Sequence, residues 1–205
     1  MNDHFKDLYH LATEEERQNG LTWYQEARGF AEGLAAKYDQ PLERVIGIIA
    51  SLSPRCPWSV NCRQAKEFIR TKGNTTVTTY RTNKKKAKAI LKGRDPIEAL
   101  TPVRPDRTTK TISFYHNILS PETSEEVTID SLMIRAYYND PNYDVKRAFN
   151  NGSIMKELSN RIKAIASEEG LKPHQVQAML WQAWKRITDT KPYTNVVNYE
   201  SLLQG

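Results

Sequence analysis

The sequence predicts an all-α fold, and three observations support this class. Apolar residues recur at helical spacing along most of the 205-residue chain, rather than alternating as they do in half-buried strands. Glycines stand where helices are expected to end, at Gly93 and Gly170. Only residues 73–80 resemble a strand, and an isolated strand has no partner with which to form a sheet. We therefore predict that residues 73–80 form a loop between helices.

The first half of the chain predicts three helices. Residues 21–38 carry an apolar stripe at helical spacing that consists of Trp23, Ala27, Phe30, Ala31 and Leu34. Residues 41–53 are apolar on nearly all sides, which predicts a buried helix that opens at Pro41 and ends before Pro54. A third helix is predicted from about residue 58 to 71, and its inward face is formed by Val60, Ala65, Phe68 and Ile69.

The second half of the chain continues the helical pattern. Further helices are predicted over residues 82–92, 95–100, 108–119, 130–139, 153–169 and 173–188. Turns between them are indicated by residues 139–142 (NDPN) and 150–152 (NNG). The tail from Lys191 onward shows little pattern, and the sequence contains no internal repeat.

Length and composition limit the class of protein. A chain of 205 residues is long enough to bury a core in one domain or in two small lobes. It has no run of eighteen apolar residues, so no membrane span is expected, and its N-terminus does not resemble a signal peptide. Cys56 and Cys62 lie too close together to brace the fold and have no nearby ligands for a metal. We therefore expect a cytoplasmic monomer with reduced thiols, no metal and no cofactor.

Positive charge is concentrated in residues 81–110. This segment contains ten basic and three acidic residues, a local net charge of +7, whereas the rest of the chain sums to −1. Such an excess attracts polyanions, and phosphate neutralisation is the main source of non-specific nucleic-acid affinity. The phosphate-binding residues predicted here include Lys84, Lys85, Lys86 and Lys88. The other interpretation is a solvated, lysine-rich helix face, which is common.

Two segments about seventy residues apart carry a pair of motifs. Residues 45–61 (VIGIIASLSPRCPWSVN) form an apolar helix that runs into a polar turn, and residues 110–119 (KTISFYHNIL) are followed by residues 127–135 (VTIDSLMIR). In order, spacing and several identities these segments resemble the helix-hairpin-helix DNA glycosylases of the endonuclease III type. The patterns of that family are L-S-A-Q-T-x-D-x-x-V-N, then L-P-G-V-G-x-K-T-A, then V-D-T-x-V-x-R. The resemblance spans roughly residues 41–187.

The resemblance implies a two-lobed helical fold and an enzyme that flips a nucleotide and cleaves its N-glycosidic bond. One lobe is expected at about residues 41–118 and the other at residues 1–40 plus 119–190, with residues 191–205 as a tail. The partner would be DNA, and the sequence leaves duplex and single strand undecided. Small phage-encoded relatives share the S-P-R-x-x-W-x-x-N and T-I-D segments, and a phage-encoded member of this kind would be found in the cytoplasm of its host cell.

Asp130 is the candidate catalytic carboxylate. In the family the V-D turn supplies this group, and an arginine follows at the spacing of Arg135. A carboxylate there would stabilise positive charge that develops on the sugar as the base leaves, or would orient the nucleophile. The other interpretation is structural, because aspartate is a preferred N-cap residue and either Asp130 or Thr128 would cap the helix that follows.

Lys110 is the candidate nucleophile of an additional lyase reaction. Family members that also cut the strand use a lysine at the start of the helix that precedes the aspartate, and Lys110 lies twenty residues before Asp130. Lysine acts as a nucleophile in its neutral form, which burial or a neighbouring cation such as Arg107 favours. The alternative is a surface lysine at the edge of the basic segment.

The segment that precedes Lys110 departs from the family pattern. Family members use glycines there so that backbone amides approach a DNA phosphate closely. Residues 100–110 (LTPVRPDRTTK) contain no glycine. Phosphate binding would pass to the side chains of Arg104, Arg107 and Thr108, or would be weakened or lost. The alternative function is therefore a catalytically inactive protein that binds nucleic acid or inhibits a partner.

The remaining candidates lie in the turn after residue 52 and in the last long helix. In the family, the residue at the position of Arg55 fills the gap left by the flipped base. Trp58 would stack on a base or begin a helix inside the core, and Asn61 would contact DNA or bridge two loops. Gln177 and Trp181 share one helix face and would read a flipped base, although tryptophans at helical spacing more often belong to a core.

Overall fold

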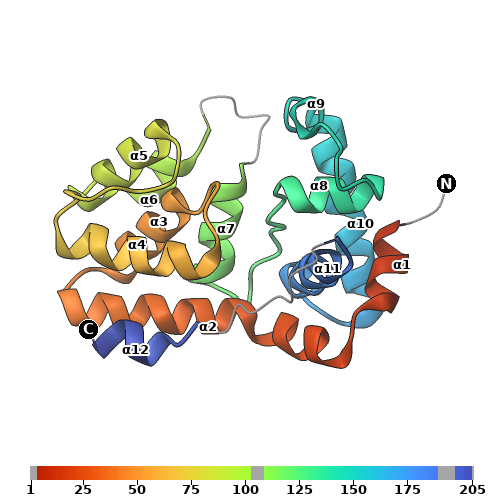
Figure 1. Cartoon of the computed structure of the whole chain (residues 1–205), viewed down its shortest axis with the longest axis horizontal. Coiled ribbons are helices and arrows are strands. Elements are labelled where there is room, and N and C mark those ends of the chain that lie inside the picture. Colours follow the sequence, from red (N-terminus) through yellow and green to blue (C-terminus); the bar gives the residue numbers. More distant parts are fainter. Residues whose placement is uncertain (1–3, 103–108, 189–196, 205) are drawn as a thin grey trace. The chain divides into compact units, whose positions relative to one another are not determined.

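The computed structural model describes residues 4–102, 109–188 and 197–204. Every regular element in these ranges is an α-helix, which confirms the all-α prediction (Figure 1). Residues 73–80 contain neither helix nor strand, as predicted. In the described part of the chain, no helix is both long enough and apolar enough to cross a membrane.

The chain divides into two compact units within helix α2 (Glu14–Tyr38). Unit 1 comprises Met1–Tyr24 and Ser120–Thr194, and unit 2 comprises Gln25–Leu119 and Asn195–Gly205. These bounds differ from the expected lobes in two places. Residues 25–40 belong with the residues that follow them rather than with the N-terminal helices, and the end of the tail belongs to unit 2 rather than standing apart.

Contacts of α2 and of helix α12 (Tyr199–Gln204) explain both differences. The rings of Phe30 and Tyr199 lie 5.4 Å apart between their centroids. The Lys37 ammonium donates a hydrogen bond to the carbonyl oxygen of Leu203 at 2.6 Å. A Cβ atom at Gly33 would lie 2.5 Å from the end of the Leu203 side chain, so the two helices are in contact at this point.

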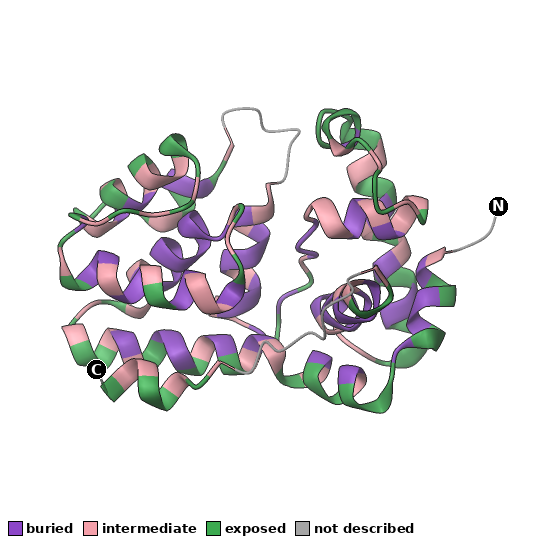
Figure 2. Ribbon diagram, in the orientation of Figure 1, coloured by how far each residue is buried: buried purple, intermediate pink, exposed green. Residues whose placement is uncertain are grey.

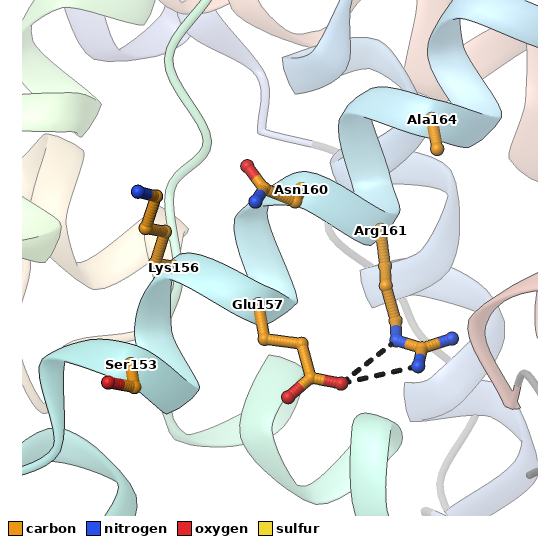
Figure 3. A pocket seen from close by; sticks show the side chains of 6 residues that line it. All are labelled: Ser153, Lys156, Glu157, Asn160, Arg161 and Ala164. Carbon is orange, nitrogen blue, oxygen red and sulfur yellow. Dashed lines mark hydrogen bonds and ion pairs between the residues drawn. The ribbon is translucent and has the colours of Figure 1, made fainter.

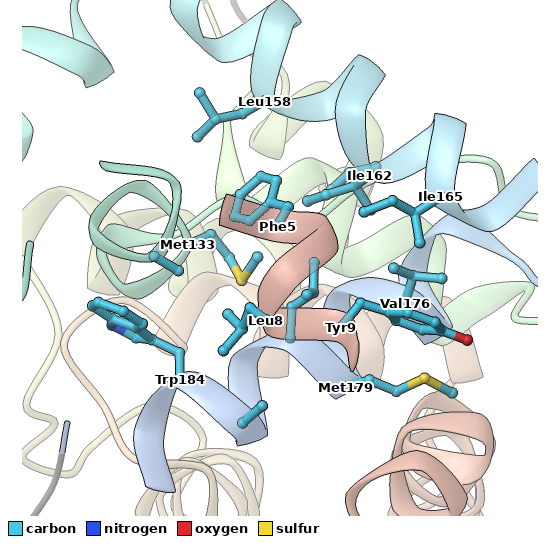
Figure 4. Close-up of a cluster of buried hydrophobic side chains, with 14 of the residues drawn as sticks. Phe5, Leu8, Tyr9, Met133, Leu158, Ile162, Ile165, Val176, Met179 and Trp184 are labelled. Atoms are coloured by element: carbon cyan, nitrogen blue, oxygen red, sulfur yellow. The ribbon is translucent and has the colours of Figure 1, made fainter. Parts of the chain in front are cut away.

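Unit 1 is built around a single apolar cluster. Its helices besides α2 are α1 (His4–Leu11), α8 (Ser131–Tyr138), α9 (Val145–Phe149), α10 (Gly152–Glu169) and α11 (Pro173–Thr188). Helix α1 packs against α8, α10 and α11, and Phe5, Met133, Ile162 and Val176 are among the side chains buried between them (Figure 4). Because these side chains come from both ends of the chain, unit 1 depends on α1 for its core.

Unit 2 is built around helix α3 (Leu42–Leu52). The other helices are α4 (Trp58–Arg70), α5 (Arg81–Leu91), α6 (Pro96–Leu100) and α7 (Lys110–Leu119), together with the second part of α2 and α12. Helix α3 packs against α4, α5, α6 and α7, and all residues from Val45 to Leu52 are buried (Figure 2). The prediction of a buried helix over residues 41–53 is therefore confirmed.

Local signals account for several helix ends. Gly170 has φ of 65° at the C-terminus of α10, and Gly93 has φ of 103° just after α5, as expected for glycines that terminate helices. The side chain of Asp95 accepts a hydrogen bond from the backbone N–H of Glu98 and caps α6. Pro41 occupies the N-cap of α3 rather than its first helical position.

The structure corrects the predicted pattern in places. Trp23 is only half-buried, whereas its neighbour Tyr24 is buried. Val60 is also half-buried rather than fully inward. Helices α1, α9 and α12, which are five to eight residues long, were not predicted.

Candidate functional site

Asp130 caps helix α8 in unit 1. One carboxylate oxygen, Oδ1, accepts hydrogen bonds from the backbone N–H groups of Leu132 at 2.9 Å and Met133 at 3.1 Å. The residue is half-buried and follows the buried segment Val127–Ile129. The N-cap interpretation is therefore correct. It leaves the catalytic interpretation open, because the cap uses Oδ1 alone.

The second carboxylate oxygen of Asp130 faces helix α11. Its Oδ2 atom accepts a hydrogen bond from the indole Nε1–H of Trp181 at 3.3 Å. The Trp181 ring is half-buried, and the ammonium of Lys185 lies 5.1 Å from its centroid. The structure thus brings together two predicted site residues, Asp130 and Trp181, and adds Lys185, which the sequence did not single out.

Gln177 lies one turn before Trp181 but is 6% exposed. Its Oε1 accepts a hydrogen bond from the Tyr24 hydroxyl at 2.8 Å. The same Tyr24 oxygen is 3.0 Å from the Thr128 hydroxyl. Because a phenol has one proton, Thr128 donates to Tyr24 while Tyr24 donates to Gln177. Gln177 therefore belongs to a buried polar group behind the Val127–Ile129 segment rather than to an open base pocket.

His174 extends this polar group. Its Nε2 lies 2.7 Å from the carbonyl oxygen of Pro121, to which it donates, and its ring packs edge-on against Tyr24 at 4.9 Å between centroids. Burial lowers the pKa of His174, and the hydrogen bond to Pro121 opposes this only in part. The imidazole is therefore held neutral. Tyr24, Thr128 and His174 were not predicted as site residues, because only the packing brings them together.

The buried His174 predicts a loss of stability in mild acid. Its pKa in the folded state is below the ordinary value of 6.5, so the unfolded chain takes up a proton first as the pH falls. The contribution is complete above about pH 6.5 and is lost below it, by at most about 1.4 kcal/mol per pH unit. Denaturant unfolding between pH 7 and 5 should show a shallower decline for His174→Gln than for the wild type. The control, His10→Gln at an exposed site on α1, should follow the wild type, and equal slopes in all three proteins would refute the prediction.

Arg135 lies in the last turn of α8 and is half-buried. Its Nε atom is buried and has no hydrogen-bond partner among the described residues. A buried N–H without a partner destabilises a protein unless water or a ligand accepts the bond. Arg135 therefore stays a candidate for an anion contact.

Lys110 is the first residue of α7 in unit 2 and is half-buried. Burial raises the pKa of the nearby Cys56 thiol and outweighs the effects of Thr78, Lys110 and Arg63, which act to lower it. Cys56 is therefore not set up as a thiolate nucleophile. Lys110 belongs to unit 2 and Asp130 belongs to unit 1.

The turn between α3 and α4 holds Arg55 in a strained conformation. Arg55 has φ of 61°, a left-handed backbone geometry that is uncommon outside glycine. Its side chain is exposed, and the guanidinium carbon lies 5.4 Å from the ring centroid of Tyr80. Arg55 therefore lies on the surface of unit 2, and its contact with DNA stays a prediction.

Trp58 and Asn61, predicted to contact nucleic acid, belong to the interior of unit 2 instead. Trp58 is 6% exposed, packs edge-on against Phe114, and donates its indole N–H to the Tyr199 hydroxyl at 2.8 Å. Asn61 is 1% exposed, and its Nδ2 donates to the carbonyl oxygen of Ile49 at 3.2 Å. Neither side chain presents a free face to a base. The helix-start interpretation of Trp58 is therefore correct, whereas Asn61 links helix α4 to helix α3 rather than two loops.

The four lysines of α5 fall into two pairs. The Lys84 ammonium donates to the carbonyl oxygen of Thr75 at 2.6 Å, and that of Lys86 to the carbonyl oxygen of Leu100 at 3.4 Å. Burial also lowers the pKa of Lys86. Lys85 and Lys88 are exposed. The phosphate contacts stay a prediction, and we expect them mainly from Lys85 and Lys88, because Lys84 and Lys86 each donate to a carbonyl oxygen of unit 2.

These pairs predict different salt dependences of nucleic-acid binding. Replacing Lys85 and Lys88 by alanine should reduce the slope of log affinity against log salt concentration by about 1.4 to 1.8, since each phosphate contact contributes about 0.7 to 0.9. The matched control replaces Lys84 and Lys86 by alanine, and its slope should equal that of the wild type within experimental error. Fluorescence anisotropy at four salt concentrations measures both slopes. A slope that falls only in the control would reverse the assignment.

Three predicted phosphate ligands cannot be placed. Arg104, Arg107 and Thr108 lie outside the described residues. Within the described ranges, no group of three or more histidine, cysteine, aspartate or glutamate side chains is arranged to hold a metal ion. Cys56 and Cys62 are both free thiols.

A shallow pocket lies along helix α10 in unit 1. Figure 3 shows its lining, which consists of Ser153, Lys156, Glu157, Asn160, Arg161 and Ala164. Glu157 and Arg161 form an ion pair at 3.2 Å, and Glu157 also accepts a hydrogen bond from the Tyr137 hydroxyl at 2.7 Å. No predicted site residue lines this pocket, and its central charges are paired with each other. It is therefore not the candidate site.

Comparison with known proteins places the chain in a family but not in a functional class. The family model described as "Family of unknown function (DUF7178)" matches residues 1–188. No curated protein and no solved structure matches the chain. Helices α1 to α11 lie within the matched range, whereas α12 lies beyond it. The function must therefore be inferred from the residues themselves.

Proposed function

The chain belongs to the DUF7178 family, and we propose that it is a DNA glycosylase-like enzyme that flips a nucleotide and cleaves its N-glycosidic bond. One observation carries the proposal. Asp130, in the V-T-I-D segment that resembles the catalytic turn of helix-hairpin-helix glycosylases, is half-buried and held in place through both of its oxygens. A fixed carboxylate is the group that this reaction requires.

The chemistry assigns a direct role to Asp130. When the bond between the sugar C1′ and the base nitrogen breaks, the base leaves with the electron pair and the sugar gains positive charge. A carboxylate near C1′ stabilises that charge, and water then adds to the sugar. The backbone amides of Leu132 and Met133 fix Oδ1, so that the carboxylate needs little reorganisation during the reaction. Trp181 beside Oδ2 offers a half-buried aromatic face to the base.

The fold is compatible with the proposed relationship. Helix-hairpin-helix glycosylases are helical and two-lobed, and this chain is all-α with two compact units. The V-T-I-D segment leads into α8, and K-T-I begins α7, so both motifs stand at helix starts, as the resemblance implies. We propose that these two units correspond to the two lobes of a helix-hairpin-helix glycosylase.

The test is a panel of oligonucleotides that contain damaged, mismatched or modified bases, in single-stranded and duplex form. Released base is measured by chromatography, and the abasic site is measured as a strand break after alkali treatment. Base release from at least one substrate supports the proposal. If no substrate yields free base, although the protein binds the same oligonucleotides, the glycosylase assignment is wrong and the binding function stands.

Lys110→Gln separates two forms of the enzyme. If Lys110 is the nucleophile, borohydride traps a covalent complex of wild-type enzyme and DNA, and we expect trapping to disappear in the variant. Lys163→Gln, at an exposed position on α10, is the matched control and should trap as the wild type does. Trapping that persists in Lys110→Gln would remove Lys110 from the chemistry. Base release without any trapping in the wild type would define a monofunctional glycosylase.

The second candidate function is nucleic-acid binding without catalysis. One observation favours it: residues 100–110 contain no glycine, whereas the family uses glycines there to bring backbone amides close to a DNA phosphate. This alternative predicts salt-dependent binding that Asp130→Asn does not change and no base release from any substrate.

A further inference from the structure

Tyr80 is an exposed aromatic residue that the sequence did not mark as functional. Its side chain is 52% exposed, directly before the basic helix α5, and Tyr80 makes no side-chain hydrogen bond that caps the helix. The exposed guanidinium of Arg55 lies over its ring, with 5.4 Å between the guanidinium carbon and the ring centroid. A planar cation and an aromatic ring thus share one exposed spot on unit 2.

The side chain of Gln64 on α4 forms hydrogen bonds with both segments that carry this pair. Gln64 Oε1 accepts hydrogen bonds from the backbone N–H and the hydroxyl of Thr78, at 3.1 and 3.3 Å. The same oxygen lies 3.8 Å from the sulfur of Cys56, which donates to it. Cys56 follows Arg55 in the turn, and Thr78 lies two residues before Tyr80. Both segments are therefore anchored on one amide oxygen, which reduces the ordering cost when the pair binds a ligand.

Helix α5, which begins directly after Tyr80, carries a row of exposed positive charges. Arg81, Lys85 and Lys88 are exposed and follow one another at spacings of four and three residues, so they share one face of the helix. At 1.5 Å of rise per residue they span about 10 Å along the axis. The helix contains no acidic residue that would offset them. A stacking surface beside a row of cations is the arrangement that proteins use for single-stranded nucleic acids.

We propose that Tyr80 and Arg55 stack on an unpaired nucleobase while Arg81, Lys85 and Lys88 contact phosphates of the same single strand. This inference rests on the proposed nucleic-acid function. It adds that the bound nucleic acid is single-stranded and that its binding site lies on unit 2. A paired base inside a duplex has both faces covered by its neighbours, so it cannot reach a ring on the surface of the protein. The chemistry required of the ligand is an aromatic base linked to phosphates, which both DNA and RNA supply.

The test compares a twelve-nucleotide single strand of DNA, the same sequence in RNA, and the DNA duplex, with affinities measured by fluorescence anisotropy. Tyr80→Ala should weaken binding of the single strand by about 5- to 150-fold, the equivalent of losing one base stack. Tyr80→Phe should bind within about twofold of the wild type, since it keeps the ring. Duplex affinity should change little. The DNA and RNA arms show which strand the site prefers.

Two further variants examine Arg55. Arg55→Lys keeps the charge but loses the planar group, so single-strand affinity should fall while the salt slope is retained. Arg55→Gly also removes the charge and relieves the strained backbone, so it should weaken binding without lowering the melting temperature. The control is Phe149→Ala, at an exposed aromatic residue in unit 1, which should leave binding unchanged.

The outcomes separate this inference from the proposed function. If the wild type binds single strands and Tyr80→Ala binds them equally well, the stacking site is refuted while nucleic-acid binding stands. If Tyr80→Ala weakens duplex and single strand alike, the specificity for an unpaired base is refuted. If the wild type binds none of the three nucleic acids, the binding function and this inference both fail.

Discussion

Replacing Asp130 by asparagine should lower the rate of base release by about 10²- to 10³-fold on any substrate that the wild type cleaves. The substitution removes the negative charge that stabilises the developing cation on the sugar. It keeps the length of the side chain and the ability to cap α8, since asparagine caps helices about as well as aspartate. Single-turnover kinetics with enzyme in excess measure the chemical step directly.

The matched control is Asp144→Asn. Asp144 caps α9 in the same unit by accepting a hydrogen bond from the backbone N–H of Lys146 at 3.1 Å, so the exchange tests capping without the candidate chemistry. The rate of base release should stay within about twofold of the wild type. An Asp130→Asn protein with wild-type turnover would show that Asp130 is an N-cap and no more.

The contact with Trp181 refines this design. When the asparagine oxygen accepts from the backbone amides, its Nδ2 group faces the indole N–H of Trp181, and two donors oppose each other. We therefore expect Asp130→Asn to lose about 1 kcal/mol of stability. Combining it with Trp181→Phe removes the second donor and should restore part of that loss. Activity that stays low in the double variant separates the loss of charge from the loss of stability.

Replacing Phe5 by alanine should destabilise unit 1 by about 3 to 5 kcal/mol. Phe5 is fully buried between α1, α8 and α10, and its ring packs against Tyr137 at 5.6 Å between centroids (Figure 4). Its removal leaves a cavity in the cluster that joins the two ends of the chain. The midpoint of denaturant unfolding should fall, and hydrogen exchange should accelerate in α8 and α11 before it does in α3.

The control for Phe5 lies on the same helix. Leu11 is 61% exposed, so Leu11→Ala should change stability by less than about 0.5 kcal/mol. If Phe5→Ala has as small an effect as Leu11→Ala, helix α1 is not part of the core of unit 1. Acceleration of exchange in α3 to the same extent as in α8 would show instead that the two units unfold together.

Helical periodicity predicted two of the long helices closely, whereas the longest, α2, begins at Glu14 rather than at the predicted residue 21. Residues 173–188 form α11 over the predicted range, and residues 153–169 form α10 from one residue earlier. In these segments each turn repeats the same pattern of burial, so the local signal is strong. Helix α12 could not be predicted in this way. Its six residues are helical where the Leu203 side chain packs beside Gly33 of α2, a contact between residues far apart in the chain.

Candidate site residues were predictable where the chemistry is local. A cap before α8 follows from residues 127–133, because its donors are the next backbone amides, and the structure shows that Asp130 rather than Thr128 provides it. The sequence could not show which side chains of α5 are exposed to solvent. Lys84 and Lys85 are neighbours with the same charge, yet Lys84 donates to a carbonyl oxygen of its own unit while Lys85 is exposed.

The sequence by itself determined the helical class, the position of most helices, the concentration of positive charge and a cap at Thr128 or Asp130, because each depends on residues close together in the chain. Only the tertiary structure decided which side chains meet. It buried Trp58 and Gln177 in the interiors of their units and joined Asp130 to Trp181 across fifty-one positions. Such contacts depend on the packing of whole helices, and no spacing within one segment determines that packing.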